Sequence, residues 1–294
     1  MVPVEPDIRL LTAGDLDDAF GLSAAAGWNQ GLPDWRKLLQ LAPAGSFAAV
    51  TERRVVGTAI GIDYGTFGWI AMMLVDPSLR GRGLGARLLE AAMDAVPADV
   101  PIRLDATPLG RPLYRRYGFE DEVMLTRHVA QPSRSPGDGA ADHVSLPVRR
   151  LTSADLPRVT ALDRQVFGAD RGTVLEWALG GAPQYAHATE TDAGVQYSLG
   201  RRGRLFDLLG PVVAADDNTA QALVSASLVA AEGRAVAVDS FDRHSGFTDW
   251  LRSRGFTAQR PLFRMRRAPR KGVDALTNSF QTIQERAILG PEFG

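Results

Sequence analysis

The stretch that decides the fold is LVDPSLRGRGLGARLLEAAM, residues 74–93. It begins with the end of an apolar strand, continues into a turn with glycine at positions 81, 83 and 85, and ends in an amphipathic helix. Glycine has no Cβ, so the backbone N–H groups of this turn can approach an anion closely. The first amides of the helix and the positive end of its dipole face the same point. The pattern predicts a site for a phosphate or pyrophosphate.

Three arginines, Arg80, Arg82 and Arg87, add positive charge to this turn. Two familiar phosphate loops do not fit it. The nucleoside triphosphatase loop needs a Gly-Lys-Ser/Thr triplet, which is absent. The dinucleotide fingerprint needs Gly-x-Gly-x-x-Gly near the first strand of its unit, and both the spacing and the position differ here. The alternative interpretation is a tight strand-to-helix turn on a solvated arginine face.

An internal repeat organises the chain. IRLLTAGDL at 8–16 matches VRRLTSADL at 148–156, and LYRRYGF at 113–119 matches WLRSRGF at 250–256. RLDA at 103–106 is echoed by AVDS at 237–240, so the offset stays between 134 and 140. This constancy favours a duplicated domain. Residues 131–146 are rich in Pro, Ser, Gly and Asp and are typical of a linker. The predicted domains are therefore 1–130 and 147–294.

Helices and strands alternate in the first copy. The spacing of apolar residues and the turn signals predict a first helix that is capped by Thr12 or Asp15 and runs through Leu22. Further helices are predicted from Pro33 onward, over 86–95 and over 111–117. Strands are predicted at 46–50, 55–63, 68–75, 101–105 and 123–129. The expected fold class is a mixed α/β layer structure.

Composition excludes several classes of protein. The 294 residues are 45% apolar and 23% charged with a net charge of -1, so no global basic field is available to hold nucleic acid. The absence of cysteine excludes disulfides, iron–sulfur clusters and a cysteine nucleophile. Four histidines without ligand spacing predict no metal site. No secretory signal and no membrane-spanning stretch is found, so the expected compartment is the cytoplasm, without membrane association.

Two motifs together resemble a known family. Arg80-x-x-Gly83-x-Gly85 after a strand, followed by Leu-Tyr-x-x-x-Gly-Phe at 113–119, resembles the GNAT superfamily of N-acetyltransferases. LDATPLGRPLY at 104–114, with GWNQ at 27–30, further resembles a bacterial subgroup that carries two GNAT-like domains in tandem, the second degenerate. The resemblance implies two tandem GNAT-like domains, each a mostly antiparallel mixed sheet flanked by helices.

The resemblance also implies roles for individual residues. Acetyl-CoA would be the co-substrate, and the strand at 72–75 would splay from its neighbour and offer backbone groups to the pantetheine amides. Tyr114 would donate its phenolic proton to the departing CoA thiolate; the alternative is an ordinary half-buried core tyrosine. The residues implied in acetyl-CoA binding are Leu74, Val75, Arg80, Gly81, Arg82, Gly83, Leu84, Gly85, Ala86 and Arg87.

The general base departs from the family pattern. Many GNAT members use a glutamate on the strand before the loop, and residues 69–75 contain no carboxylate. Asp105 on the following strand is the first candidate, Asp63 the second, and a water chain to solvent the third. The alternative for Asp105 is a structural carboxylate that caps the turn at 107–110.

Trp28 and Asn29 are candidates for the acceptor pocket, because GNAT folds usually build that pocket between the two N-terminal helices. Asn29 could hold an amide or hydroxyl and Trp28 could form a wall; the alternative is a helix C-cap with a core tryptophan. The expected reaction is direct attack of a small-molecule primary amine in a ternary complex, by a monomer or homodimer. A non-catalytic acyl-CoA or metabolite sensor is the alternative. A nucleic-acid modifier is disfavoured by 13 basic against 16 acidic residues in the first copy.

The second copy lacks the features that carry chemistry in the first. At the corresponding place it has LLGPVVAADDNTAQALVSAS, residues 208–227, where constant offsets set Ala215, Asn218 and Ala220 against Arg80, Gly83 and Gly85. A helix could still form there, with Asp217 or Asn218 as its cap. Two aspartates there would repel a pyrophosphate, and Leu251 replaces Tyr114. We expect residues 147–294 to bind no CoA and to wall the acceptor cleft. The apolar run at 283–294 is expected to pack, against a surface that the sequence does not identify.

Overall fold

The computed structural model describes residues 5–52, 54–131, 146–231, 233–272 and 284–294. The linker predicted at 131–146 therefore lies almost wholly outside the described residues. The chain folds as two compact units. Unit 1 is Met1–Asp105, Pro112–Glu120 and Arg266–Ala275, and unit 2 is Ala106–Arg111, Asp121–Met265 and Leu276–Gly294. Each unit thus takes in a segment from the other sequence copy, and the domain boundaries expected from sequence remain a prediction.

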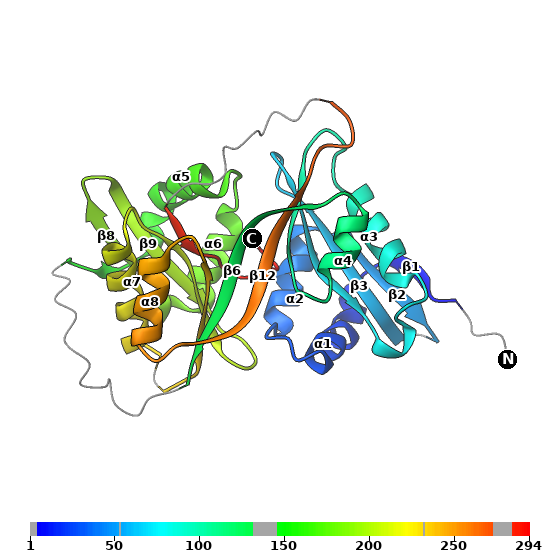
Figure 1. The fold of residues 1–294 in the computed structure, drawn as a ribbon, viewed down its shortest axis with the longest axis horizontal. Helices are drawn as coiled ribbons and strands as arrows, with labels where there is room; N and C mark the ends of the chain where they lie inside the picture. The colour runs from blue at the N-terminus through cyan, green and yellow to red at the C-terminus, as the bar shows by residue number, and fades with distance from the viewer. Residues whose placement is uncertain (1–4, 53, 132–145, 232, 273–283) are drawn as a thin grey trace. The chain divides into compact units, whose positions relative to one another are not determined.

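Unit 1 is built around a five-stranded sheet in the order β1-β2-β3-β4-β5, antiparallel except for the last pair. Helices α1 and α2 cover one face and α3 covers the other (Figure 1). The elements are β1 (Asp7–Leu10), α1 (Leu16–Ala25), α2 (Leu32–Leu41), β2 (Ser46–Thr51), β3 (Arg54–Asp63), β4 (Gly68–Val75), α3 (Leu84–Asp94), β5 (Ile102–Ala106) and α4 (Arg111–Arg116). The mixed α/β fold class expected from the sequence is confirmed.

Close packing of α3 on β3 depends on two glycines. A Cβ at Gly61 would lie 2.1 Å from the backbone oxygen of Ala92, and one at Gly57 would lie 2.8 Å from a methyl carbon of Leu88. The helix sits directly on the strand at these points, with Leu88 and Ala92 fully buried. This contact fixes α3, and with it the start of the helix, relative to the sheet.

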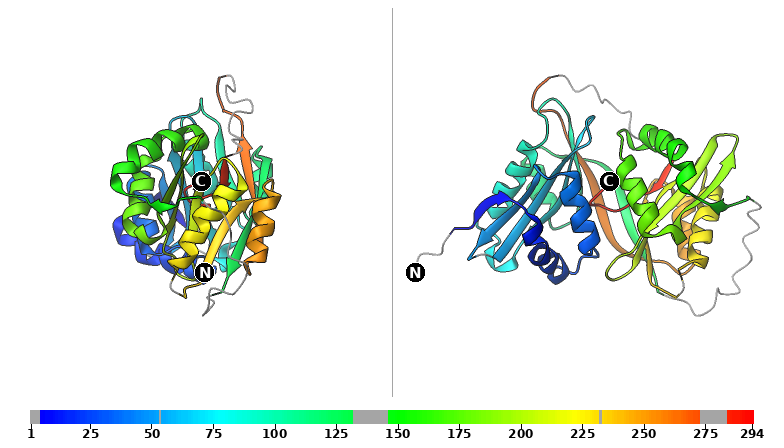
Figure 2. Two further views of the ribbon diagram at one scale, coloured as in Figure 1. Left: turned by 90° about the vertical axis from the view of Figure 1, so that its left-hand side faces the viewer. Right: turned by 180° about the vertical axis from the view of Figure 1, so that it is seen from behind.

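Unit 2 repeats this order of elements. Its sheet has the order β12-β6-β11-β13-β10-β9-β8-β7, with α5 and α6 on one face and α7 and α8 on the other (Figures 1 and 2). The elements are β6 (Glu120–Ala130), β7 (Arg149–Arg150), α5 (Leu156–Phe167), α6 (Gly172–Gly181), β8 (His187–Thr191), β9 (Gly194–Arg201), β10 (Asp207–Val213), α7 (Asp217–Val229), β11 (Val236–Phe241), α8 (Ser245–Ser253), β12 (Thr257–Arg267) and β13 (Glu285–Ala287). No helix among the described residues is long and apolar enough to span a bilayer.

Two details of unit 2 differ from the sequence-based expectation. The N-cap of α7 is Asp216, whose side chain accepts a hydrogen bond from the Thr219 amide at 2.7 Å, and not Asp217 or Asn218. Three residues, 214–216, separate β10 from α7, whereas eight, 76–83, separate β4 from α3. The second copy has therefore lost most of the loop, and the residue-by-residue substitution inferred from constant offsets is wrong.

We expect Gly61→Ala to destabilise the protein by about 3 kcal/mol, because the new methyl group overlaps backbone that cannot move without shifting α3. Gly21→Ala is the matched control: it lies in α1 with no atom within 4 Å of the added Cβ, and we expect a gain of about 0.5 kcal/mol. Urea denaturation of both variants measures the difference. Equal stabilities would contradict the packing argument.

A second prediction concerns pH. His187 is buried beside the Ser227 hydroxyl, and burial, aided by the charge of Arg150, lowers its pKa to about 4. The unfolded chain has a histidine pKa of about 6.5 and so binds more protons between these values. Stability should therefore fall as the pH drops from 6.5 towards 4. The denaturation midpoint of His187→Gln should depend less steeply on pH in this window than that of the wild type; equal slopes would argue against the assignment.

Candidate active site

The loop between β4 and α3 is held in place at its first half. The Asp76 carboxylate accepts hydrogen bonds from the Ser78 amide at 3.0 Å and the Ser78 hydroxyl at 2.7 Å. Asp76 thereby caps the short helical turn Pro77–Leu79, and these bonds lower the pKa of its carboxyl group. Arg80 donates from Nε to the backbone oxygen of Val75 at 3.0 Å. The chain is thus anchored up to the first glycine of the turn.

The second half of the loop presents free backbone amides. Within the described part of the chain, no acceptor is found for the N–H groups of residues 81–85. Gly81 and Gly83 have φ angles of 76° and 83°, a region that favours glycine. The backbone oxygen of Gly83 accepts from the Ala86 and Arg87 amides at 3.0 and 3.2 Å and so begins α3. The N-cap residue is a glycine, so no side chain occupies these donors. An anion can accept them together.

Positive charge surrounds these amides. The Arg80 and Arg82 side chains are exposed, on either side of Gly81. Arg87 forms an ion pair of 2.6 Å with Glu5, which is 78% exposed. An exposed pair of this kind contributes little, so a bound phosphate can compete for the guanidinium. Leu84 is buried and Ala86 half-buried in the first turn of α3, where they fix the helix start.

Strands β4 and β5 part well before β4 reaches the loop. They pair in parallel only at Gly68↔Ile102 and Trp69↔Arg103. Between Ala71 and Leu74, β4 has one residue more than the facing part of β3, and this bulge puts Met72 at a φ of 50°. The backbone beyond the bulge, which includes Leu74 and Val75, has no partner strand on the β5 side among the described residues of unit 1. This edge can accept an extended chain of amides, as expected of pantetheine.

Tyr114 lies on α4 beside the loop. A Cβ at Gly85 would lie 3.7 Å from methyl groups of both Leu113 and Val75, so α4 packs against the junction of β4 and α3. The Tyr114 ring is 8% exposed and meets Phe119 edge-on at 5.9 Å. Burial raises the pKa of Tyr114 well above its usual value, so the phenol stays protonated. It is a donor at every physiological pH.

Asp105 is half-buried on β5, two residues beyond Arg103, where β5 has already left β4. It therefore lies close to the point where the two strands begin to part. The following turn is closed by Thr107, whose hydroxyl and backbone oxygen accept from the Gly110 amide at 3.3 and 3.0 Å. Whether Asp105 acts as a general base or caps this turn remains a prediction.

Asp63 is engaged elsewhere. Its carboxylate accepts from the Gly65 amide at 2.7 Å and holds the turn between β3 and β4. It faces Gly68, seven residues from Val75, so it lies about 20 Å from the loop along the strand. The geometry gives Asp63 a structural role in the turn and does not bring it to the loop.

Trp28 and Asn29 follow α1 directly. Gly27 has a φ of 73°, and the Trp28 amide donates to the Ser23 backbone oxygen at 3.0 Å, which is a helix C-cap. The C-cap alternative thus describes the backbone correctly. Asn29 is 2% exposed and Trp28 is half-buried. Their part in an acceptor pocket remains a prediction.

Sequence reasoning missed two features of this site. Nothing in the local sequence marks the bulge, because methionine rarely adopts the positive φ that Met72 has here. The Met72 backbone oxygen accepts a hydrogen bond at 2.7 Å from the hydroxyl of Thr58, a residue of β3 that is distant in the sequence. The Asp76 cap could have been found, since Asp-Pro-Ser after a strand is a typical start of a helical turn.

Comparison with known proteins agrees with this geometry. Two family models described as "Acetyltransferase (GNAT) domain" match, one over residues 43–121 and the other over residues 159–275. Together they span most of both units. The chain belongs to the GNAT superfamily of acetyltransferases and carries two such domains in tandem.

Individual relatives support the same fold. An uncharacterized N-acetyltransferase of Bacillus subtilis, YitH, is 26% identical over 197 residues, which cover 66% of this chain and 67% of the relative. The crystal structure of a putative acetyltransferase from Pyrococcus horikoshii has a TM-score of 0.72 at 22% identity and covers 100% of this chain and 98% of its own. A tandem GNAT protein from the clavulanic acid biosynthesis pathway has a TM-score of 0.62 at 17% identity, and the match covers 92% of this chain and 100% of that protein's chain.

Gly83→Asp should weaken acetyl-CoA binding at least about tenfold, because it adds backbone strain and a negative charge among the free amides. Gly194→Asp is the matched control: its φ is 88°, its Cβ position is open, and it is the first residue of β9 in unit 2, directly after the β8–β9 turn. Calorimetric titration compares the two variants with the wild type. Equal weakening in both would show that strain alone accounts for the loss.

Proposed function

We propose that this protein transfers an acetyl group from acetyl-CoA to a primary amine of a small molecule, by direct attack within a ternary complex. The observation that carries the proposal is the row of free amides at residues 81–85, placed beside the unpaired edge of β4. A pyrophosphate fits the amides and a chain of amides fits the edge. The absence of cysteine leaves direct transfer simpler than a thioester-linked enzyme intermediate.

The residues of unit 1 divide the binding between them. Gly81, Gly83 and Gly85 give close access to the backbone donors, and Arg80 and Arg82 add charge. Leu74 and Val75 supply the backbone groups of the strand edge. When bound there, acetyl-CoA supplies an acetyl group activated as a thioester: the amine nitrogen bonds to the acetyl carbon as its bond to sulfur breaks.

Tyr114 acts as the proton donor to the leaving sulfur. The contact of the neighbouring Leu113 with the Gly85 position supports this role, because it holds α4 against the junction of β4 and α3. A free tyrosine has a pKa of about 10 and a thiol about 8.5, and burial raises the tyrosine further. Complete proton transfer is therefore uphill. Tyr114 stabilises the developing thiolate by a hydrogen bond and shares its proton rather than delivering it fully.

Asp105 accepts the proton that the amine must lose. The proposal is supported by the position of Asp105 on β5, two residues beyond the last pair with β4, and by the lack of a carboxylate on β4 itself. Asp63 is held in its turn, so a water chain to solvent is the remaining alternative. The lack of a carboxylate on β4 also favours a second candidate function, a sensor that binds acyl-CoA without turnover. Release of free thiol over a panel of amines separates the two functions.

Tyr114→Phe should lower kcat about a hundredfold while acetyl-CoA binding changes less than about twofold, because the ring stays and only the donor is lost. Tyr117→Phe is the control, because the Tyr117 hydroxyl, just after α4, donates to the exposed Glu90 of α3 at 2.6 Å. Thiol release with a responsive amine gives kcat. Full turnover in Tyr114→Phe would remove this residue from the mechanism.

A further inference from the structure

The second copy also has a gap between its parallel strands, and the chain itself fills it. Strands β10 and β11 pair only at Asp207↔Val236 and Leu208↔Ala237, the same two-pair ladder as in unit 1. Beyond it, β13 lies between them and is antiparallel to both. Ala287 pairs with Val212 on one side and with Ser240 on the other.

Hydrogen bonds fix this inserted segment at both ends. The Ala214 amide, just after β10, donates to the backbone oxygen of Gln284 at 2.8 Å. The Ile288 amide donates to the backbone oxygen of Asp239 on β11 at 3.1 Å. The edge of β10 that corresponds to the open edge of β4 is therefore occupied by polypeptide.

The inserted segment follows the bulge of β10. The pairing of β10 with β9 shifts between Leu209 and Val212, as that of β4 with β3 shifts between Ala71 and Leu74. A Cβ at Gly210, inside this bulge, would lie 2.0 Å from the backbone oxygen of Ile288. The chain passes so close that only glycine fits, which indicates that strand and inserted segment are built for one another.

Apolar side chains complete the filling. Ile288, Leu289 and Phe293 are fully buried. Phe293 packs against Trp177 of α6 with ring centroids 5.2 Å apart, and Ile288 joins a cluster with Phe241 of β11. Such burial stabilises unit 2 as an ordinary core does.

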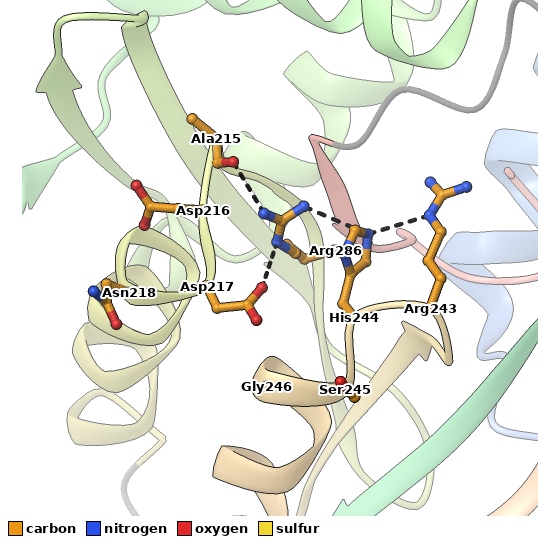
Figure 3. A pocket seen from close by; sticks show the side chains of 9 residues that line it. All are labelled: Ala215, Asp216, Asp217, Asn218, Arg243, His244, Ser245, Gly246 and Arg286. Carbon is orange, nitrogen blue, oxygen red and sulfur yellow. Dashed lines mark hydrogen bonds and ion pairs between the residues drawn. The ribbon is translucent and has the colours of Figure 1, made fainter.

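An arginine of the inserted segment reaches the start of α7, which corresponds in the order of elements to the start of α3 in unit 1. Arg286 of β13 points to the start of α7, where its Nε lies 2.9 Å from the Asp217 carboxylate and one Nη donates to the Ala215 backbone oxygen at 3.1 Å (Figure 3). The other Nη lies 3.4 Å from His244. These residues line a pocket of 430 Å³. The short loop here is acidic and receives an arginine, whereas the long loop of unit 1 is basic and presents free amides.

Buried ion pairs hold the remainder of the segment. Glu285 lies 3.6 Å from Arg171 of unit 2, which is itself bonded at 2.9 Å to Asp163. Glu292 is paired with Arg201, and both side chains are almost completely buried. Breaking one member of such pairs leaves an uncompensated buried charge, so the segment is costly to remove.

We propose that residues 284–294 are the permanent occupant of the second copy's acyl-CoA cleft. Their backbone takes the position of the pantetheine amides along β10, and the Arg286 side chain takes the position of the pyrophosphate. The second copy is thereby a scaffold that binds no acyl-CoA. The comparison rests on the proposed function of unit 1, because it assumes that acetyl-CoA binds in the equivalent gap there.

Calorimetric titration of the full chain with acetyl-CoA, followed by hydrogen exchange, tests the proposal. We expect one site per chain, slow exchange in peptides covering 284–290, and no change in those peptides at saturation, while peptides covering 80–86 slow on binding. Two sites per chain, or faster exchange at 284–290 on binding, would overturn the proposal that residues 284–294 occupy the cleft. No binding at all would overturn the proposed function of unit 1. In that case fast exchange at 284–290 would still contradict the proposal that this segment fills the gap in unit 2.

A charge swap tests the Arg286 contact. Arg286→Asp or Asp217→Arg alone should speed exchange at 284–290 at least tenfold, and the double variant should restore most of the protection, with acetyl-CoA affinity unchanged in all three. Arg252→Asp is the control, since it breaks an exposed ion pair with Asp249 on α8 of the same unit. Exchange in Arg286→Asp as slow as in the wild type, or no recovery in the double variant, would contradict the proposal.

Discussion

Two parallel strands that part after two residue pairs are the constraint on which both units depend. Parting leaves backbone N–H and C=O groups along one strand without partners, and such groups need a hydrogen bond wherever water is excluded. Both strands also share a bulge, at which their pairing with the neighbouring antiparallel strand shifts by one residue. Each unit must therefore supply something to complete its sheet. We infer that unit 1 uses a ligand, and unit 2 uses β13.

The two copies keep the sheet and differ in the loops. The turn after α4 and the turn after α8 have the same hydrogen bond, from Phe119 to Tyr114 and from Phe256 to Leu251, at 3.2 and 3.1 Å. At this conserved geometry one copy has a phenol and the other a fully buried leucine. The strand-to-helix loop is shorter by most of its length in the second copy. Loops on a rigid scaffold can change in this way while the core is maintained.

Local patterns were sufficient for much of the fold and of the candidate site. The strand at 68–75 has the bounds predicted, because a glycine begins it and Asp76-Pro77 ends it. The free amides of the loop could be predicted from Gly81 and Gly83, because glycine favours backbone conformations that other residues rarely adopt. These features depend on residues close together in the chain.

Features that depend on distant residues were not predictable. β6 was expected as a strand, but nothing local indicated that it pairs with β11, where Arg127 and Asp239 form a buried ion pair of 2.6 Å. Strand β13 has three residues and no periodicity of its own. Its conformation is set by β10 and β11, so the packing surface of the final run could not be named. The shortened loop was missed because a constant offset compares residues and does not register a deletion.

The position of β13 in the chain has a consequence for how the protein is made. β13 follows its partner β10 by more than seventy residues, yet it lies inside the sheet and closes it. During synthesis β10 and β11 leave the ribosome first, with their facing edges unsatisfied until the final strand arrives. Contacts this distant in sequence slow folding, and open strand edges attract other chains. We expect a nascent chain that ends before β13 to depend on chaperones, although almost all of its second sheet has already been synthesised.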